Sequence, residues 1–126
     1  MRAADTNVLL RDFVQDDAKQ TAVSREFLKA GAWISHVVLA EFVWVLDSSY
    51  GRSSTEIADA IELLLGHESV VLQDAETVVM ALTSFRARPR IAFADHLILE
   101  IARKAGHLPL GTFDRKLGRL DGAQKL

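Results

Sequence analysis

A chain of 126 residues, with 49% hydrophobic and 25% charged residues, has the size and composition of one globular domain, which argues against intrinsic disorder. The balance of 15 Lys and Arg against 17 Asp and Glu argues against a broadly basic nucleic-acid binder, and the lack of cysteine excludes disulfides, thiolate metal sites and cysteine nucleophiles. No apolar run approaches the roughly 20 residues that cross a bilayer, and no secretory signal precedes the first acid, so we expect one cytoplasmic domain over residues 1–126.

The first part of the chain is predicted to contain a strand followed by two helices. Residues 1–4 are expected to form a short strand, although its alanines have little β-propensity and little bulk to pack. A short helix follows Asp5, and a second helix begins at Asp17 as its N-cap and ends at Gly31. The residues predicted for the inner face of the second helix are Val23, Phe27 and Ala30.

The middle of the chain is predicted to contain another strand followed by two helices. Residues 32–34 are expected to be the strand, and Ser35 is expected to cap a helix that carries Glu41 near its beginning. Ser53 and Glu56 have the spacing of a capping box, in which each side chain accepts a bond from the other residue's backbone N–H. This box predicts the start of the next helix.

The last part of the chain repeats the alternation of strand and helix. Residues 69–72 are expected to be a third strand, with Asp74 as the N-cap of the helix after it. Pro89 breaks the chain, and the next helix ends at Gly106 and has Asp95 in or just before its first turn. The apolar residues that mark this helix are Leu97, Ile98, Ile101, Ala102 and Ala105.

A final apolar segment, residues 108–111, leads directly to Asp114, and Pro109 suits only its beginning or an edge position. Segments of strand length and helix length therefore alternate along the chain, which indicates an α/β fold. We expect a three-layer sandwich with a short parallel sheet of about four to five strands flanked by helices.

Four acidic residues lie just after predicted strands or near the start of predicted helices. In an open parallel sheet, ligands bind beyond the carboxyl ends of the strands, and Asp5, Asp95 and Asp114 map to that edge. Glu41 lies about one and a half turns into its helix, so its longer side chain would reach the same place. Crowded carboxylates repel one another unless a multivalent cation neutralises them, so this cluster predicts a metal site.

The donor atoms narrow the choice of metal and its chemistry. Oxygen ligands without thiolates fit hard cations, and we expect Mg²⁺ or Mn²⁺. Such an ion activates a water molecule and neutralises the leaving oxygen in phosphodiester hydrolysis. The alternative is that these acids are ordinary surface groups, N-caps or ion-pair partners, as most of the 17 acids must be.

Four short motifs, in order along the chain, resemble those of PIN domains. Residues 5–11 (DTNVLLR) resemble the opening motif of the family, and residues 34–41 (ISHVVLAE) resemble the second. Residues 93–98 (FADHLI) and 112–117 (TFDRKL) resemble the third and fourth motifs, so the resemblance spans almost the whole chain. The acids that it implies as catalytic metal ligands are Asp5, Glu41, Asp95 and Asp114.

The resemblance also implies an activity and a partner. PIN chains of this size are similar to VapC-type toxins, which cleave RNA until a VapB antitoxin occupies the site. We therefore expect a Mg²⁺- or Mn²⁺-dependent endoribonuclease with RNA as substrate and a VapB-like antitoxin as partner. The alternatives are a PIN nuclease outside a toxin–antitoxin system and a non-catalytic module whose acidic cleft receives a Lys or Arg of a partner.

Three polar side chains and five cations lie close to the acids in sequence. Thr6, Asn7 and Thr112 are candidates for orienting the carboxylates, with ordinary turn and cap chemistry as the alternative. A basic rim beside the acids would bind RNA phosphates despite the negative net charge, with a merely solvated loop as the alternative. The cations of this rim are Arg86, Arg88, Arg90, Arg115 and Lys116.

Other chemistries lack their motifs. The chain has no Gly-x-Ser-x-Gly elbow for a serine hydrolase and no Gly-rich phosphate loop, and residues 108–114 lack the lysine of a receiver-like domain. The four histidines, at positions 36, 67, 96 and 107, do not have the spacing of metal ligands. We assign them no role and expect His96 on a helix surface.

Apolar residues are more numerous in one region than a single helix face can bury. Trp33, Val43 and Trp44 mark this region, which indicates a homodimer interface or an antitoxin groove. The alternative is that both faces are buried within the α/β core.

Overall fold

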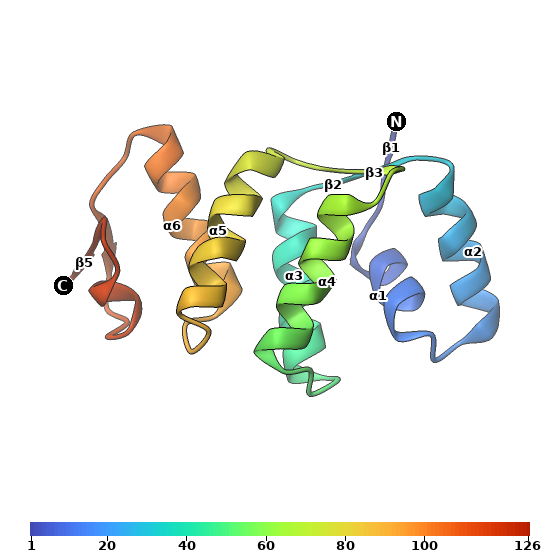
Figure 1. Ribbon diagram of the computed structural model, residues 1–126, viewed down its shortest axis with the longest axis horizontal. Coiled ribbons are helices and arrows are strands. Elements are labelled where there is room, and N and C mark those ends of the chain that lie inside the picture. The colour runs from blue at the N-terminus through green and yellow to red at the C-terminus, as the bar shows by residue number, and fades with distance from the viewer. The chain divides into compact units, whose positions relative to one another are not determined.

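The computed structural model describes all residues from Met1 to Leu126 (Figure 1). It contains two compact units, Met1–Ala75 and Glu76–Leu126. None of its helices combines the length and the apolar character that spanning a membrane requires. That the chain forms one domain stays a prediction.

Three short parallel strands form the sheet of the first unit. In the order β1, β2, β3, Arg2 lies opposite Ala32, and Ala32 lies opposite Val70. The predicted N-terminal strand is confirmed but is only two residues long, and the N–H of Ala4 continues its pairing by donating to the carbonyl of Trp33 at 3.0 Å. The strands are β1 (Arg2–Ala3), β2 (Ala32–Ile34) and β3 (Val70–Leu72).

Four helices pack around this sheet. α1 contacts both α2 and α3, α2 also contacts β2, and α4 contacts both α3 and β3. The predicted N-caps at Asp17 and Ser35 and the capping box of Ser53 and Glu56 are confirmed. The helices are α1 (Thr6–Val14), α2 (Ala18–Lys29), α3 (His36–Ser48) and α4 (Ser54–Gly66).

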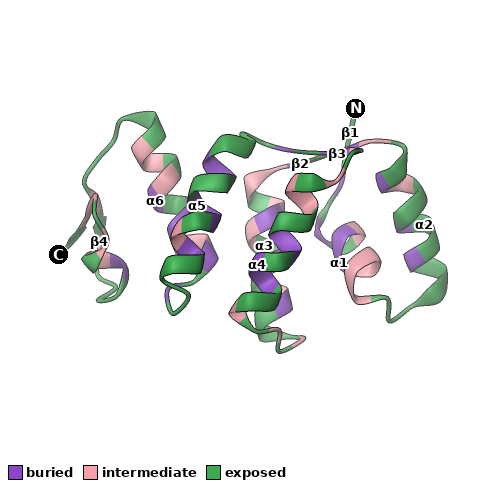
Figure 2. Cartoon of the chain, in the orientation of Figure 1, coloured by how far each residue is buried: buried purple, intermediate pink, exposed green.

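The predicted inner face of α2 is wrong. Val23 is 66% exposed, whereas Thr21, Ser24 and Leu28 are buried. Figure 2 shows that α2 carries both exposed and buried positions. The hydroxyl of Thr21 donates to the carbonyl of Arg11 at 2.8 Å, so burial leaves this polar group satisfied. Small hydroxyl side chains therefore allow α2 to pack closely against α1.

The second unit contains two helices, a 3₁₀ helix and a small parallel sheet. α5 (Ala75–Ala87) begins one residue before this unit and buries Val78, Leu82 and Phe85. β4 and β5 pair in parallel, with Leu110 opposite Ala123. The other elements are α6 (Phe93–Ala105), β4 (Leu110–Thr112), the 3₁₀ helix η1 (Leu117–Arg119) and β5 (Ala123–Lys125).

The α/β class and the parallel strands agree with the sequence, but the strands form two sheets, of three and two strands, where the sequence predicted one sheet. β5 was not predicted, because its residues Ala, Gln and Lys have little β-propensity. Close packing holds it instead, since a Cβ on Gly118 of η1 would lie only 2.8 Å from the Cβ of Lys125.

The helix predicted before Gly106 is confirmed as α6, but the apolar residues that marked it are not all buried. Ile98 and Ile101 are 48% and 39% exposed, whereas His96 is buried together with Phe93 and Leu97. Gly106 ends the helix in the left-handed conformation, with φ 83°, as its position predicted. The buried face of α6 therefore includes a histidine that the pattern of apolar residues did not indicate.

Candidate acidic site

Asp5 follows β1 and is the N-cap of α1. Its Oδ1 accepts hydrogen bonds from the backbone N–H groups of Asn7 at 3.1 Å and Val8 at 3.4 Å. The cap satisfies two of the backbone donors that every helix start leaves open, and it fixes the direction of the carboxylate. Asp5 stays exposed, so its second oxygen is accessible to a ligand.

Glu41 lies in the second turn of α3 and is exposed. α3 begins directly after β2, the parallel neighbour of β1, so Asp5 and the start of α3 lie at the same carboxyl edge of the sheet. Contact between α1 and α3 keeps the two helices together. The first unit therefore carries two of the four predicted ligands on neighbouring elements.

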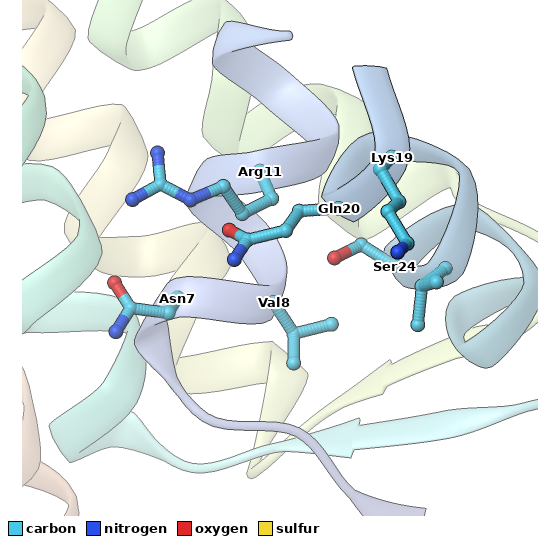
Figure 3. Close-up of a pocket in the computed structure, with 7 residues that line it drawn as sticks. Asn7, Val8, Arg11, Lys19, Gln20 and Ser24 are labelled. Carbon is cyan, nitrogen blue, oxygen red and sulfur yellow. The ribbon is translucent and has the colours of Figure 1, made fainter. Parts of the chain in front are cut away.

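Thr6 and Asn7 lie beside Asp5 in different surroundings. Thr6 is buried, whereas the Asn7 side chain lines an open groove of about 610 Å³ between α1 and α2 (Figure 3). Asn7 supports Asp5 through its backbone N–H, and the orienting role of the two side chains stays a prediction. The groove is lined by Asn7, Val8, Arg11, Lys19, Gln20, Val23 and Ser24.

Arg11 is held firmly at this groove. Its guanidinium forms an ion pair of 2.9 Å with Asp16. A hydrogen bond with Tyr50 and the charge of Asp16 raise the pKa of Arg11 above its ordinary value. This cation is therefore already neutralised within the chain.

Asp95 and Asp114 form an acid pair in the second unit. Asp95 lies in the first turn of α6 and is half-buried. Burial and, second, the negative charge of Asp114 raise the pKa of Asp95, while His96 acts in the opposite direction. No hydrogen bond to the Asp95 carboxylate offsets these effects. Asp95 is therefore a half-buried carboxylate that forms no ion pair with an Arg or Lys.

Asp114 follows β4 and starts the turn that leads to η1. Its Oδ1 accepts a bond from the backbone N–H of Leu117 at 2.8 Å. Its own N–H donates to the hydroxyl of Thr112 at 3.0 Å. Thr112 therefore contacts the backbone of Asp114, and its role in orienting the carboxylates stays a prediction.

The donor set fits a hard divalent cation. All four acids offer only carboxylate oxygens. Burial and, second, repulsion from Asp114 raise the pKa of Asp95, and a bound cation offsets both effects. Within neither unit do three His, Cys, Asp or Glu side chains come together to hold a metal ion. Each unit carries two of the acids, and that all four share one ion stays a prediction.

His96 is not the surface residue that the sequence predicted. Its Nδ1 lies 2.8 Å from the Oγ of Ser84, and its Nε2 lies 3.0 Å from the carbonyl oxygen of Arg88. A carbonyl only accepts, so Nε2 carries the hydrogen and the Ser84 hydroxyl donates to Nδ1. Burial lowers the pKa of His96, which keeps the ring neutral. Both polar ends of the ring are thus satisfied in the core.

Only three of the five cations of the predicted basic rim line a common cavity. Arg88, Arg90 and Lys116 line one cavity of about 360 Å³, whereas Arg86 and Arg115 do not. Arg119, which the sequence did not lead us to expect, also lines it. Its signal was its position three residues after Lys116, which is one turn of a 3₁₀ helix. The cavity is lined by Ala87, Arg88, Pro89, Arg90, Ile91, Lys116 and Arg119.

The comparisons with known proteins agree with the motifs. A family model described as the PIN domain matches residues 3–123, which include the acids of both units. No curated relative matches the sequence.

Proposed function

The chain belongs to the PIN-domain family, and on that premise we propose that it is a metal-dependent endoribonuclease, the toxin of a VapBC-like toxin–antitoxin pair. Membership of the family indicates a nuclease that acts on nucleic acid. The observation that carries the proposal is the acid pair of Asp95 and Asp114, in which Asp95 is half-buried, feels the negative charge of Asp114 and forms no ion pair with an Arg or Lys.

The proposed ligands of the metal are Asp5, Glu41, Asp95 and Asp114, with Thr6, Asn7 and Thr112 as supporting residues. Mg²⁺ or Mn²⁺ bound there would supply an activated water and neutralise charge on the leaving oxygen. The protein's part is to fix the ligands. The N-cap bonds hold Asp5, and bonds from Leu117 and to Thr112 hold Asp114. Pre-positioned carboxylates bind a cation without first losing conformational freedom.

We further propose a VapB-like antitoxin and a second copy of the chain as partners, with cytoplasmic RNA as substrate. Exposed apolar side chains on α3 support a protein partner: Val37 is 77% exposed and Trp44 is 66% exposed. Val43 does not contribute, because it is buried, contrary to the expectation from the sequence. Light scattering by the purified chain at several concentrations measures whether it dimerises.

The decisive experiment is cleavage of a mixed, structured RNA by the purified chain with Mg²⁺ or Mn²⁺. We expect cleavage that EDTA abolishes and that Asp95→Asn reduces by orders of magnitude. Asp121→Asn is the matched control, because it removes an equal charge from an exposed position of the same unit, and it should retain activity. No cleavage with either metal, in a chain whose circular dichroism shows a folded protein, would favour the non-catalytic binding module.

A further inference from the structure

We propose that the cavity lined by Arg88, Arg90, Lys116 and Arg119 binds one backbone phosphate of single-stranded RNA together with the nucleoside attached to it. The inference rests on the proposed function, and it names the part of the protein that holds the substrate strand. We call this space the cationic cavity.

The charges of the cationic cavity lack counter-charges within the protein. Elsewhere in the chain, arginines form ion pairs with carboxylates, as Arg11 does with Asp16, Arg25 with Asp12, and Arg103 with Glu100. None of the four cations of the cavity forms such a pair. Like charges gathered without neutralisation repel one another, and the protein has a net charge of −2, so this is a local concentration of positive charge. A bound phosphate relieves that repulsion.

One wall of the cavity is a loop with a fixed backbone. The N–H of Arg88 donates to the carbonyl of Ser84 at 2.9 Å. The carbonyl of Arg88 in turn accepts from the N–H of Ile91 at 3.2 Å and from Nε2 of His96 at 3.0 Å. The buried histidine therefore ties the loop to α6, and the cavity exists before a ligand arrives.

The other wall is the turn that Asp114 begins. The carbonyl of Asp114 accepts from the N–H of Gly118 at 3.0 Å, and the N–H of Arg119 donates to the carbonyl of Lys116 at 3.1 Å. Asp114 thus starts the turn that carries both cations of this wall. On the first wall, Ile91 is followed after one residue by α6, whose first turn contains Asp95. Both walls are therefore connected to the acid pair by short segments of the chain.

The size and lining of the cavity favour a nucleotide over a free phosphate ion. Its volume of about 360 Å³ is within the range of small-ligand sites and exceeds what a phosphate alone fills. Ala87, Pro89 and Ile91 add an apolar surface to the cations. A base exposed in a single strand can lie against such a surface or against a guanidinium plane, whereas the bases of a duplex are stacked and inaccessible.

The test measures RNA binding in EDTA, so it does not depend on catalysis. A fluorescent single-stranded oligoribonucleotide is titrated with protein at several salt concentrations, and its anisotropy is followed. We expect Arg88→Gln Lys116→Gln to weaken binding about tenfold or more, because charge-assisted contacts are lost. The slope of log K against log salt should fall by about 0.7 for the phosphate that is no longer neutralised.

The matched control is Lys29→Gln Lys125→Gln. It removes two positive charges from exposed residues that do not line the cavity and that were not assigned to the basic rim. We expect nearly unchanged affinity and slope, and thermal melts check that both variants fold. Equal losses in the two double variants would overturn the proposal, because net charge alone would then explain binding. Arg119→Gln should weaken binding as well, and no change there would overturn the assignment of that wall.

Two further arms distinguish the source of the phosphate and the two proposals. An oligonucleotide with a 5′-hydroxyl should bind as well as one with a 5′-phosphate, and binding that requires the terminal phosphate contradicts an internal phosphodiester. A duplex of the same sequence should bind more weakly through the cavity. If Arg88→Gln Lys116→Gln loses as much affinity for the duplex as for the single strand, the assignment to single-stranded RNA is contradicted.

The failure of this inference can be told apart from the failure of the proposed function. RNA that binds in the cavity but is never cleaved with metal refutes only the proposed function. If the wild type cleaves RNA, and the cavity variant Arg88→Gln Lys116→Gln binds RNA as tightly as the control variant does, only this inference is refuted.

Discussion

Polar side chains take core positions in both units because each finds a hydrogen-bond partner there. Thr21 donates to a backbone carbonyl of α1, and His96 bonds to Ser84 on one side and Arg88 on the other. An unpaired buried polar group costs about 1–3 kcal/mol, so such residues are tolerated only with partners. In the second unit the partner of His96 belongs to the loop of the cationic cavity, so a core residue also shapes a functional surface.

We therefore predict that His96→Ala destabilises the protein. The change removes a fully buried ring and leaves the Ser84 hydroxyl and the Arg88 carbonyl without that partner, at a cost of about 3 kcal/mol. Urea denaturation followed by circular dichroism measures the free energy of unfolding. His107→Ala, at an exposed position, is the control and should change it by less than about 0.5 kcal/mol. Equal stability of the two variants would show that the buried hydrogen bonds contribute nothing.

At the scale of the element, the ends of helices offer a test of backbone strain. α1 ends at Gln15, which has φ 59° and ψ 34° in the left-handed region, where a side chain is unfavourable. α2 ends at Ala30, with φ −74° in the ordinary right-handed region. The two ends differ in backbone conformation, although both residues are exposed.

Glycine should therefore have opposite effects at these two ends. Gln15→Gly should stabilise the protein by about 0.5–1 kcal/mol, because glycine adopts positive φ without strain. Ala30→Gly should be destabilising by up to about 1 kcal/mol, because it only adds freedom to the unfolded chain. Thermal unfolding of both variants beside the wild type measures the difference. The same sign for both would contradict the assigned conformation of Gln15.

Elements and their caps could be predicted from the sequence, but helix faces less well. The capping box at Ser53 and the glycine at position 106 are local signals, since each depends on neighbouring residues alone. The predicted inner face of α2 and the predicted surface position of His96 were wrong because counting apolar residues cannot anticipate a Thr21 or a His96 whose partner comes from another segment. β5 was missed because its residues have little β-propensity and are held by packing against η1.

At the scale of the whole molecule, the candidate site depends on long-range packing that local patterns do not encode. The sequence identified the acids by motif, and the structure places Asp5 and Asp114 in the turns expected for them. It could not predict that Asp95 is half-buried beside Asp114, or that Arg119 joins Arg88 in one cavity, because residues far apart in the chain create both features.

Binding of the proposed metal ion should stabilise the protein, and this effect tests each of the proposed ligands separately. An ion that binds only the folded chain stabilises it by about 2.7 kcal/mol at 100 times its dissociation constant, so Mn²⁺ should raise the melting temperature and EDTA should reverse the effect. Asp5→Asn in the first unit and Asp114→Asn in the second should each abolish most of the Mn²⁺-induced shift, whereas Asp121→Asn should leave it unchanged.

A shift of the melting temperature that is lost in Asp114→Asn and kept in Asp5→Asn would restrict the metal to the acid pair of the second unit. No shift in the wild type at millimolar Mn²⁺ would mean that these carboxylates do not hold a cation without bound RNA, and the four-ligand site would have to be abandoned for the free protein.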